Sequence, residues 1–269
     1  MNLAHKLTVK PGTKVKLADW DADYTANFEN KEQTLELFDK NVEKLVKLQY
    51  LLYAENKHAI LVVLQAMDAG GKDGTIRTVM GPMNPQGCRV KAFKTPSEEE
   101  LAHDFLWRIH KYVPRKGEVC VFNRSHYEDV LIVRVHNLVP QSIWASRFEQ
   151  INNFERMLVE NNIHVIKFFL YIDKNEQLKR LKERLDDPAK QWKANPVDFE
   201  ERKCWNKYTK AYEDVLARCS TDYAPWYVIP ANKKWFRNLA VAEILVEKLA
   251  DLKMKFPKPR FDISKLRVR

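Results

Sequence analysis

The sequence predicts an α/β protein in which helices cover both faces of a parallel β-sheet, giving three layers. The first observation is a set of four short apolar runs, at 60–64, 119–122, 165–172 and 226–229, with the length and composition of buried strands. The second is that each run is followed by a segment of helical composition. This alternation is typical of a three-layer fold, and a hydrophobic fraction of 45% supplies its core.

The helices are expected from amphipathic spacing and from terminal signals. Within 31–55, apolar residues recur every three to four positions, so this helix should lie against the sheet. A second helix is expected at 97–111, where three glutamates fill a first turn that favours acids. Further helices are expected at 143–161 and 237–253, the last followed by a proline-marked tail.

The net charge limits the kinds of binding partner to expect, and the cysteines indicate the cellular compartment. The 46 Lys and Arg against 36 Asp and Glu give a formal charge of +10, which favours anionic partners without choosing among nucleotides, nucleic acid and phosphate polymers. The four cysteines form no C-x-x-C pair, which favours free thiols in a reducing compartment. No signal-peptide core is present at the start, and no apolar run approaches the ~20 residues of a membrane span. We therefore expect a cytoplasmic protein.

The loop after the first strand carries the strongest functional signal. Five of the seven glycines fall within it and the segment that follows, so the backbone there needs unusual freedom. A strand, a glycine-rich turn and a helix start over 59–76 are typical of a phosphate-binding loop, to which Lys72 adds a charge. The loop departs from the Walker A pattern G-x-x-x-x-G-K-[ST], because Ala66 replaces the first glycine and Asp73 the Ser or Thr.

Asp68 is unexpected in such a loop, because its carboxylate repels phosphates unless a metal ion lies between them. This residue therefore points to a metal-dependent reaction. The alternative is that the glycines only form a tight turn between strand and helix. The residues of the loop expected to bind phosphate are Ala69, Gly70, Gly71, Lys72, Gly74 and Thr75.

The second strand ends at Asn123. In P-loop enzymes this position lies beside the phosphate loop and commonly carries an acidic magnesium ligand. Asn123 is neutral, so the charge of a metal there must be balanced by others such as Asp68 and Glu128. The alternative is that polar side chains at 123–125 cap the next helix, with His126 a packed histidine and not a base.

A lid is expected after the third strand. Arg180 and Arg184 lie four residues apart on one helix face and lead into a loop with lysines and a tryptophan. This pattern predicts a mobile lid at 174–196 that closes over phosphates. A solvated charged helix, whose cations pair with nearby acids, is the alternative.

Together these segments resemble the polyphosphate kinase 2 family over nearly the whole chain. The stretches that carry the resemblance are QAMDAGGKDGT (65–75), NPQG (84–87), FNRSHYED (122–129) and YAPWYVIP (223–230). Many members have Asp-Arg-Ser at the second strand tip, whereas Asn123 with Glu128 is similar to the class III branch. That branch is associated with phosphorylation of both nucleoside mono- and diphosphates.

The resemblance implies a thymidylate-kinase-like P-loop kinase fold with a helical lid, and assembly as a homodimer or homotetramer. It implies reversible transfer between inorganic polyphosphate and the adenine nucleotides AMP and ADP, with guanine nucleotides as further acceptors. It also implies dependence on Mg²⁺, with Mn²⁺ as a substitute. Neither a membrane nor a nucleic acid is an expected partner.

Residue roles follow from the resemblance by position. Asp68 would hold magnesium and orient or deprotonate the acceptor phosphate, and Lys72 and Arg124 would grip the transferred phosphoryl group. Asn123 and Glu128 would complete the metal shell. The polyphosphate chain would be held by Arg134, Arg180, Arg184, Lys190 and Lys193, and the acceptor would border 81–95, with Asn84, Arg89, Lys91 and Lys94.

We expect a single domain over 1–269. It would comprise an arm and helix to about 55, a core at 56–256 that contains the lid, and a tail at 257–269. An ATP-dependent nucleoside monophosphate kinase is the main alternative function, but it should keep the ordinary Gly and Ser or Thr of a triphosphate-binding loop. A nucleic-acid-binding P-loop protein is less consistent with the sequence, which has no basic run with interleaved aromatics.

Overall fold

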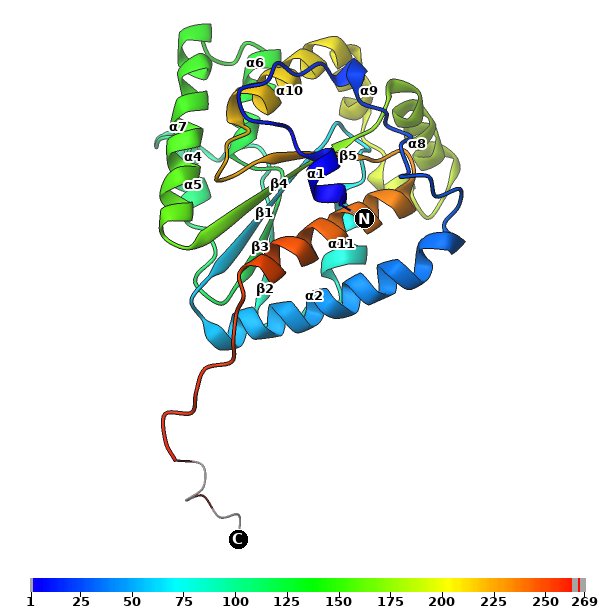
Figure 1. Ribbon diagram of the computed structural model, residues 1–269. Coiled ribbons are helices and arrows are strands. Elements are labelled where there is room, and N and C mark those ends of the chain that lie inside the picture. The colour runs from blue at the N-terminus through cyan, green and yellow to red at the C-terminus, as the bar shows by residue number, and fades with distance from the viewer. Residues whose placement is uncertain (1, 263–265, 267–269) are drawn as a thin grey trace.

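The computed structural model describes residues 2–262 and 266. At its centre lies an all-parallel sheet of five strands in the order β2-β3-β1-β4-β5 (Figure 1). Helices cover both faces, so the predicted three-layer α/β/α fold is confirmed. The strands are β1 (Ala59–Gln65), β2 (Cys88–Ala92), β3 (Val119–Asn123), β4 (Ile163–Tyr171) and β5 (Trp226–Pro230).

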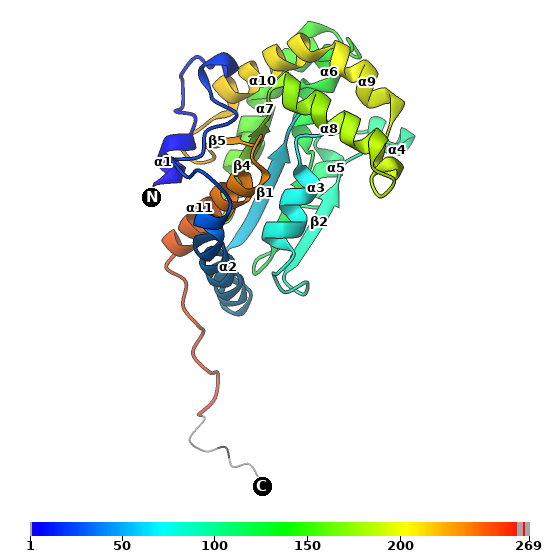
Figure 2. The same ribbon diagram turned by 90° about the vertical axis from the view of Figure 1, so that its right-hand side faces the viewer.

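The helices form two layers, with α2 and α11 on one side of the sheet and α7 and α10 on the other (Figure 2). The longer helices are α2 (Leu35–Glu55), α7 (Gln141–Glu160), α8 (Lys174–Asp186), α9 (Pro196–Lys203), α10 (Trp205–Cys219) and α11 (Lys234–Asp251). The short ones are α1 (Leu3–Leu7), α3 (Lys72–Thr75), α4 (Glu98–Leu101), α5 (Trp107–His110) and α6 (Ile132–Val135).

Strand β1 is buried on both faces, which explains its continuous apolar sequence. Ile60, Val62 and Leu64 belong to the core shared with α2 and α11, whereas Leu61 and Val63 belong to the core shared with α7 and α10. Successive side chains of a strand point to opposite faces, so one short segment holds both layers in place. No helix in the described part of the chain combines the length and apolar character needed to cross a membrane.

The segment between β1 and β3 differs from the sequence-based expectation in two places. Strand β2 was not expected, because as an edge strand with exposed positions and two basic residues it lacks an apolar run. The helix expected at 97–111 is broken into α4 and α5. Ser97 and Glu100 start α4 with a capping box, and the Asp104 side chain then accepts a hydrogen bond from the Leu106 N–H, which begins a new turn.

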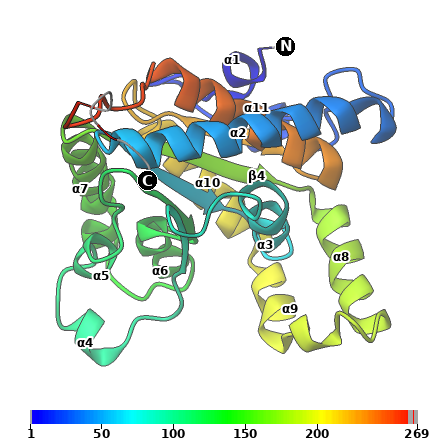
Figure 3. The same ribbon diagram turned by 90° about the horizontal axis from the view of Figure 1, so that it is seen from below.

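Helices α8 and α9 form an arm that projects from the sheet (Figure 3). Side chains on both helices join the arm together: Arg184 donates to Asp198 at 2.7 Å, and Arg202 donates to Gln177 at 2.9 Å and to the Lys174 carbonyl oxygen at 2.7 Å. The arm therefore extends beyond the lid predicted at 174–196, as far as the end of α9. Of the predicted tail, residues 263–265 and 267–269 lie outside the described residues.

Candidate active site

The turn after β1 depends on glycine at two positions. A Cβ on Gly70 would lie 2.5 Å from the Cβ of Ala66 and 2.8 Å from the carbonyl oxygen of Met67, so this close approach excludes a side chain. Gly71 has φ +102°, in the left-handed region that glycine adopts without strain. The next residue, Lys72, begins α3, so the loop ends at a helix start, as a phosphate-binding loop requires.

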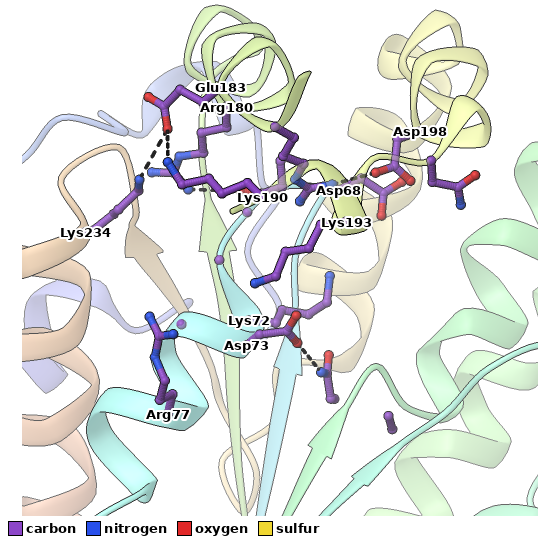
Figure 4. Close-up of a pocket in the computed structure, with 18 of the residues that line it drawn as sticks. Asp68, Lys72, Asp73, Arg77, Arg180, Glu183, Lys190, Lys193, Asp198 and Lys234 are labelled. Atoms are coloured by element: carbon purple, nitrogen blue, oxygen red, sulfur yellow. Dashed lines mark hydrogen bonds and ion pairs between the residues drawn. The ribbon is translucent and has the colours of Figure 1, made fainter. Parts of the chain in front are cut away.

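A cavity of about 940 Å³ opens beside this loop, at the carboxyl ends of β1 and β3, and the arm and the start of α11 also line it (Figure 4). Ten lysine and arginine side chains and five acidic side chains line it. The cations are Lys72, Arg77, Lys94, Arg124, Arg180, Arg184, Lys190, Lys193, Lys234 and Arg237; the acids are Asp68, Asp73, Glu183, Asp187 and Asp198.

Asp68, Lys72 and Arg124 come together in this cavity. Arg124 Nη2 donates a hydrogen bond to Asp68 Oδ1 at 3.2 Å. Burial lowers the pKa of Lys72, the Arg124 charge lowers it further, and the carboxylates of Asp68 and Glu128 oppose both effects. Within the described residues, Lys72 Nζ makes one hydrogen bond, to the Ala66 carbonyl oxygen at 3.3 Å, and forms no ion pair. A phosphate placed here would give this half-buried ammonium a direct ionic partner.

Asn123 has a partner that the sequence analysis did not identify. Its Nδ2 donates to Asp73 Oδ1 at 2.7 Å. The registers pair Leu64 of β1 with Asn123 of β3, which explains why the strand tip lies beside the loop. Asp73, which replaces the usual Ser or Thr of a phosphate loop, is therefore held by Asn123 at the strand tip. Both side chains line the cavity.

Glu128 and Thr75 do not line the cavity, although the sequence analysis assigned both to the site. Burial raises the pKa of Glu128, while the charges of Arg124 and Lys72 oppose that rise. The Thr75 hydroxyl is buried and donates to the Gly71 carbonyl oxygen at 3.2 Å, so it stabilises the loop from within.

Arg180 lines the cavity, but its guanidinium is used by the protein itself. It donates to the carbonyl oxygens of Ala69, Ala231 and Asn232 and to the carboxylate of Glu176, and the side chain is buried. That it holds the polyphosphate chain stays a prediction; in the structure, Arg180 ties the phosphate loop to the segment after β5. Its same-face partner Arg184 pairs with Asp198 within the arm.

The two lysines predicted in the lid differ in their contacts. Lys190 pairs with Asp187 at 2.9 Å and lies 3.9 Å from Glu183, which Lys234 of α11 also approaches, at 3.8 Å (Figure 4). Glu183 is thus shared between the arm and α11. Lys193 forms no ion pair within the described residues and points from the arm into the cavity (Figure 4).

Four further predicted residues lie outside the cavity, in addition to Glu128 and Thr75. Arg134 pairs with Asp214 at 2.8 Å and lies over the Trp144 ring, at a second cavity of about 750 Å³. Its assignment to the polyphosphate chain is therefore not supported by its position.

The other three residues were expected at the acceptor nucleotide. The Asn84 side chain accepts a hydrogen bond from the Gln86 N–H, Arg89 donates to two carbonyl oxygens, and Lys91 lies over the Tyr112 ring. From that segment it is Ala92, Phe93 and Lys94 that line the cavity.

Two arginines reach the cavity from positions that gave no sequence signal. Arg77 follows α3, and Arg237 lies in the first turns of α11. The Arg237 side chain is only 3% exposed and forms no ion pair with a described carboxylate; its hydrogen bonds go to Asn238 Oδ1 at 3.1 and 2.8 Å. Burial, with the nearby charge of Arg180, lowers the pKa of Arg237 to about 10.

Comparison with known proteins agrees with this geometry. The family described as Polyphosphate kinase 2 (PPK2) matches residues 27–257. The chain belongs to the polyphosphate kinase 2 family. A protein of Meiothermus ruber named AMP/ADP-polyphosphate phosphotransferase is 54% identical over 97% of this chain and 98% of its own length. A protein of Rhodopseudomonas palustris named ADP-polyphosphate phosphotransferase is 46% identical over 93% of this chain and 90% of its own.

A solved structure of the family has the same fold. The crystal structure of polyphosphate kinase 2 from Arthrobacter aurescens TC1 superposes with a TM-score of 0.94 at 42% identity, covering 98% of this chain and 94% of that one. In this polyphosphate kinase 2 protein the cavity at the strand tips is accordingly the candidate active site.

Proposed function

We propose that the protein transfers the terminal phosphoryl group of inorganic polyphosphate to AMP and ADP, in a reversible, metal-dependent reaction. Of two relatives that match nearly end to end, one is named an AMP/ADP-polyphosphate phosphotransferase and the other an ADP-polyphosphate phosphotransferase. The change of Asp to Asn at position 123, with Glu128, supports the use of both nucleotides, since it is similar to class III of the family.

The observation that carries the proposal is the group of cations in the cavity that have no carboxylate partner. Five of the ten form no ion pair with any described residue: Lys72, Arg77, Lys94, Lys193 and Arg237. They come from the loop, the helix that follows it, the segment after β2, the arm and α11. A linear polyanion provides counter-charges for cations spread in this way, and a single small anion does not.

The chain's own groups suit phosphoryl transfer. The transition state spreads charge over three equatorial oxygens, so the protein contributes mainly positioning and fixed positive charge. Lys72 and Arg124 line the same cavity and would both contact the transferred phosphoryl group, while the Asp68 carboxylate accepts a hydrogen bond from Arg124. Asp68 would also accept a proton from, or orient, an acceptor phosphate.

Mg²⁺, or Mn²⁺ in its place, is part of the proposal. Among the residues that the structure describes, no three His, Cys, Asp or Glu side chains form a preformed metal cluster. Magnesium in phosphotransferases is commonly held by one or two carboxylates, with substrate phosphates and waters as the other ligands, so this donor set fits. Asp68 and Asp73 are the carboxylates beside the loop, and Asn123 Oδ1 has no partner within the described chain. The metal would neutralise charge on the phosphates.

The rival function is an ATP-dependent nucleoside monophosphate kinase. The loop disfavours it, because Asp73 replaces the Ser or Thr that an ordinary loop offers to the metal of a triphosphate.

The test is product analysis. The protein is mixed with AMP, long-chain polyphosphate and Mg²⁺ without ATP, and the nucleotides are separated by ion-exchange chromatography. We expect ADP first and ATP later. Formation of ADP alone, with ADP refused as an acceptor, would contradict the two-step claim; a requirement for ATP as donor would support the rival.

Three finer points belong to the same proposal. Guanine nucleotides are further acceptors, which GMP in the same assay tests. The protein assembles as a homodimer or homotetramer, which light scattering after size exclusion tests. The reaction takes place in the cytoplasm; the four cysteines, unpaired in the structure, suit a reducing compartment.

A further inference from the structure

A fully buried cluster of charged and polar side chains adjoins the segment that follows β3. Glu155 of α7 forms an ion pair with Lys167 of β4, and neither side chain is exposed. The Tyr127 hydroxyl donates to Glu155 Oε1 at 2.8 Å, and His126 Nε2 lies 3.2 Å from the same oxygen. The cluster therefore joins the segment after β3 to the helix and the strand that pack against it.

The cluster is almost fully hydrogen-bonded. Lys167 uses its three donors on Glu155, the Tyr127 hydroxyl oxygen at 2.9 Å and the Cys219 carbonyl oxygen at 2.7 Å. Burial by itself would raise the pKa of Glu155, but the Lys167 charge and the His126 hydrogen bond hold it below its ordinary value. Glu155 is therefore ionised at neutral pH.

Stability is a weak explanation for a buried ion pair. Removing two charges from water is costly, and apolar side chains of similar volume often stabilise a core as well or better. Apolar and aromatic side chains such as Phe154 and Trp226 belong to the core on this side of the sheet. The pair must then be explained by what it holds in place.

What it holds is the backbone between two site residues. His126 and Tyr127 lie in sequence between Arg124 and Glu128. Arg124 has φ +62°, a left-handed conformation that strains a non-glycine residue and persists only where the surroundings enforce it. Ser125 adds to this enforcement, since its Oγ accepts from Gln65 Nε2 and from the Tyr127 N–H.

We infer that Glu155 and Lys167 are positioning residues for phosphoryl transfer. Through His126 and Tyr127 they fix the strained backbone that directs Arg124 to Asp68 and into the cavity. Neither residue lines the cavity, so both act through others. The inference rests on the proposed function, because it concerns the residues assigned to that reaction.

The test is the double variant Glu155→Gln with Lys167→Met, which removes both charges and nearly keeps both volumes. We expect the kcat of polyphosphate-dependent AMP phosphorylation to fall by about 10- to 100-fold, because misplacement of a catalytic group by about 1 Å can cost roughly 100-fold. The KM values for polyphosphate and AMP should change by no more than about threefold, because ground-state binding involves many other cations.

A control separates positioning from general loss of stability. Ile244→Val alters the opposite core, shared with α2 and α11, and should lower Tm without lowering kcat. A double variant whose kcat matches that of this control would overturn the inference, and so would a rise in KM with kcat unchanged.

If the double variant does not fold, Tyr127→Phe tests the inference instead. This change removes the hydroxyl between Lys167 and Glu155, and kcat should fall severalfold. An unchanged kcat in Tyr127→Phe would overturn the inference. Wild-type protein that does not use polyphosphate would instead contradict the proposed function.

Discussion

The Arg237 guanidinium packs directly against the phosphate loop at Gly71: a Cβ built on Gly71 would lie 1.9 Å from Arg237 Nη1. A Cβ built on Gly74 would lie 3.2 Å from Arg237 Nη2, so the guanidinium approaches this glycine less closely. The glycines of the loop thus make room for an arginine from α11 as well as for phosphate. A guanidinium buried here without a carboxylate partner is placed to bind an anion in the loop.

From this contact we predict that Arg237→Gln weakens polyphosphate binding while the fold is kept. A hydrogen bond to a charged group contributes about 1.5–3 kcal/mol, so the KM for polyphosphate should rise by roughly 10- to 100-fold. The Tm should not fall, because the variant removes an uncompensated buried charge. Steady-state kinetics with Arg237→Lys as the matched control checks this; an unchanged KM in Arg237→Gln would show that the guanidinium only packs.

Lys72→Ala should reduce turnover severely in a folded protein. The ammonium faces the charge that develops during transfer, and loss of one such group commonly costs ~10²–10³ in rate. Because burial already lowers the pKa of Lys72, its removal relieves a desolvated charge, and Tm should stay near wild type. Near-wild-type kcat in this variant would refute the assignment of the loop.

Asp68→Asn tests whether this carboxylate acts through a metal. The change keeps size and hydrogen bonding and removes one charge beside the loop. Activity should collapse, and the rise in Tm produced by Mg²⁺ with nucleotide should shrink, since that rise depends on ligand affinity. Tm without ligands should remain close to wild type. Should the variant keep its magnesium-dependent stabilisation, Asp68 is a turn residue whose role is to hold Arg124.

The pair of His58 and His164 predicts a dependence of stability on pH. Their Nδ1 and Nε2 atoms lie 3.0 Å apart. Burial, with the charge of His58, lowers the pKa of His164 below its ordinary 6.5. Below about pH 6.5 the unfolded chain therefore binds more protons than the folded one, and stability falls with falling pH.

His164→Asn should remove this contribution. Between pH 7 and pH 5.5 the Tm of wild type should fall by more than that of the variant, as measured by calorimetry. His126, whose pKa burial also lowers, is present in both proteins and cancels in the comparison. Equal changes in Tm would exclude His164 as a source of the acid sensitivity.

Parts of the fold were predictable because burial leaves a pattern in sequence. β1, β3, β4 and β5 are buried along most of their length, so each has an apolar run that predicts a strand. β2 has one neighbour in the sheet and exposed side chains, and so gave no such run. The break between α4 and α5 depends on one local hydrogen bond of Asp104, which periodicity does not register.

The site was predictable where its residues are neighbours in sequence. The loop residues and the tip of β3 form compact motifs, whereas Arg237 reaches Gly71 through the packing of α11, which only the folded chain specifies. For Arg180 the spacing from Arg184 correctly predicts that both lie on one helix face. Spacing does not reveal that the Arg180 guanidinium already donates its hydrogen bonds to backbone carbonyl oxygens.

The most direct test of the account is a ³¹P NMR time course of the protein with polyphosphate, AMP and Mg²⁺ and no ATP. We predict that the chain phosphates lost are matched by new β- and γ-phosphates of ADP and ATP, with orthophosphate constant, because the cavity transfers the group to a nucleotide and not to water. Growth of the orthophosphate signal without nucleotide phosphorylation, or no change until ATP is added, would contradict it.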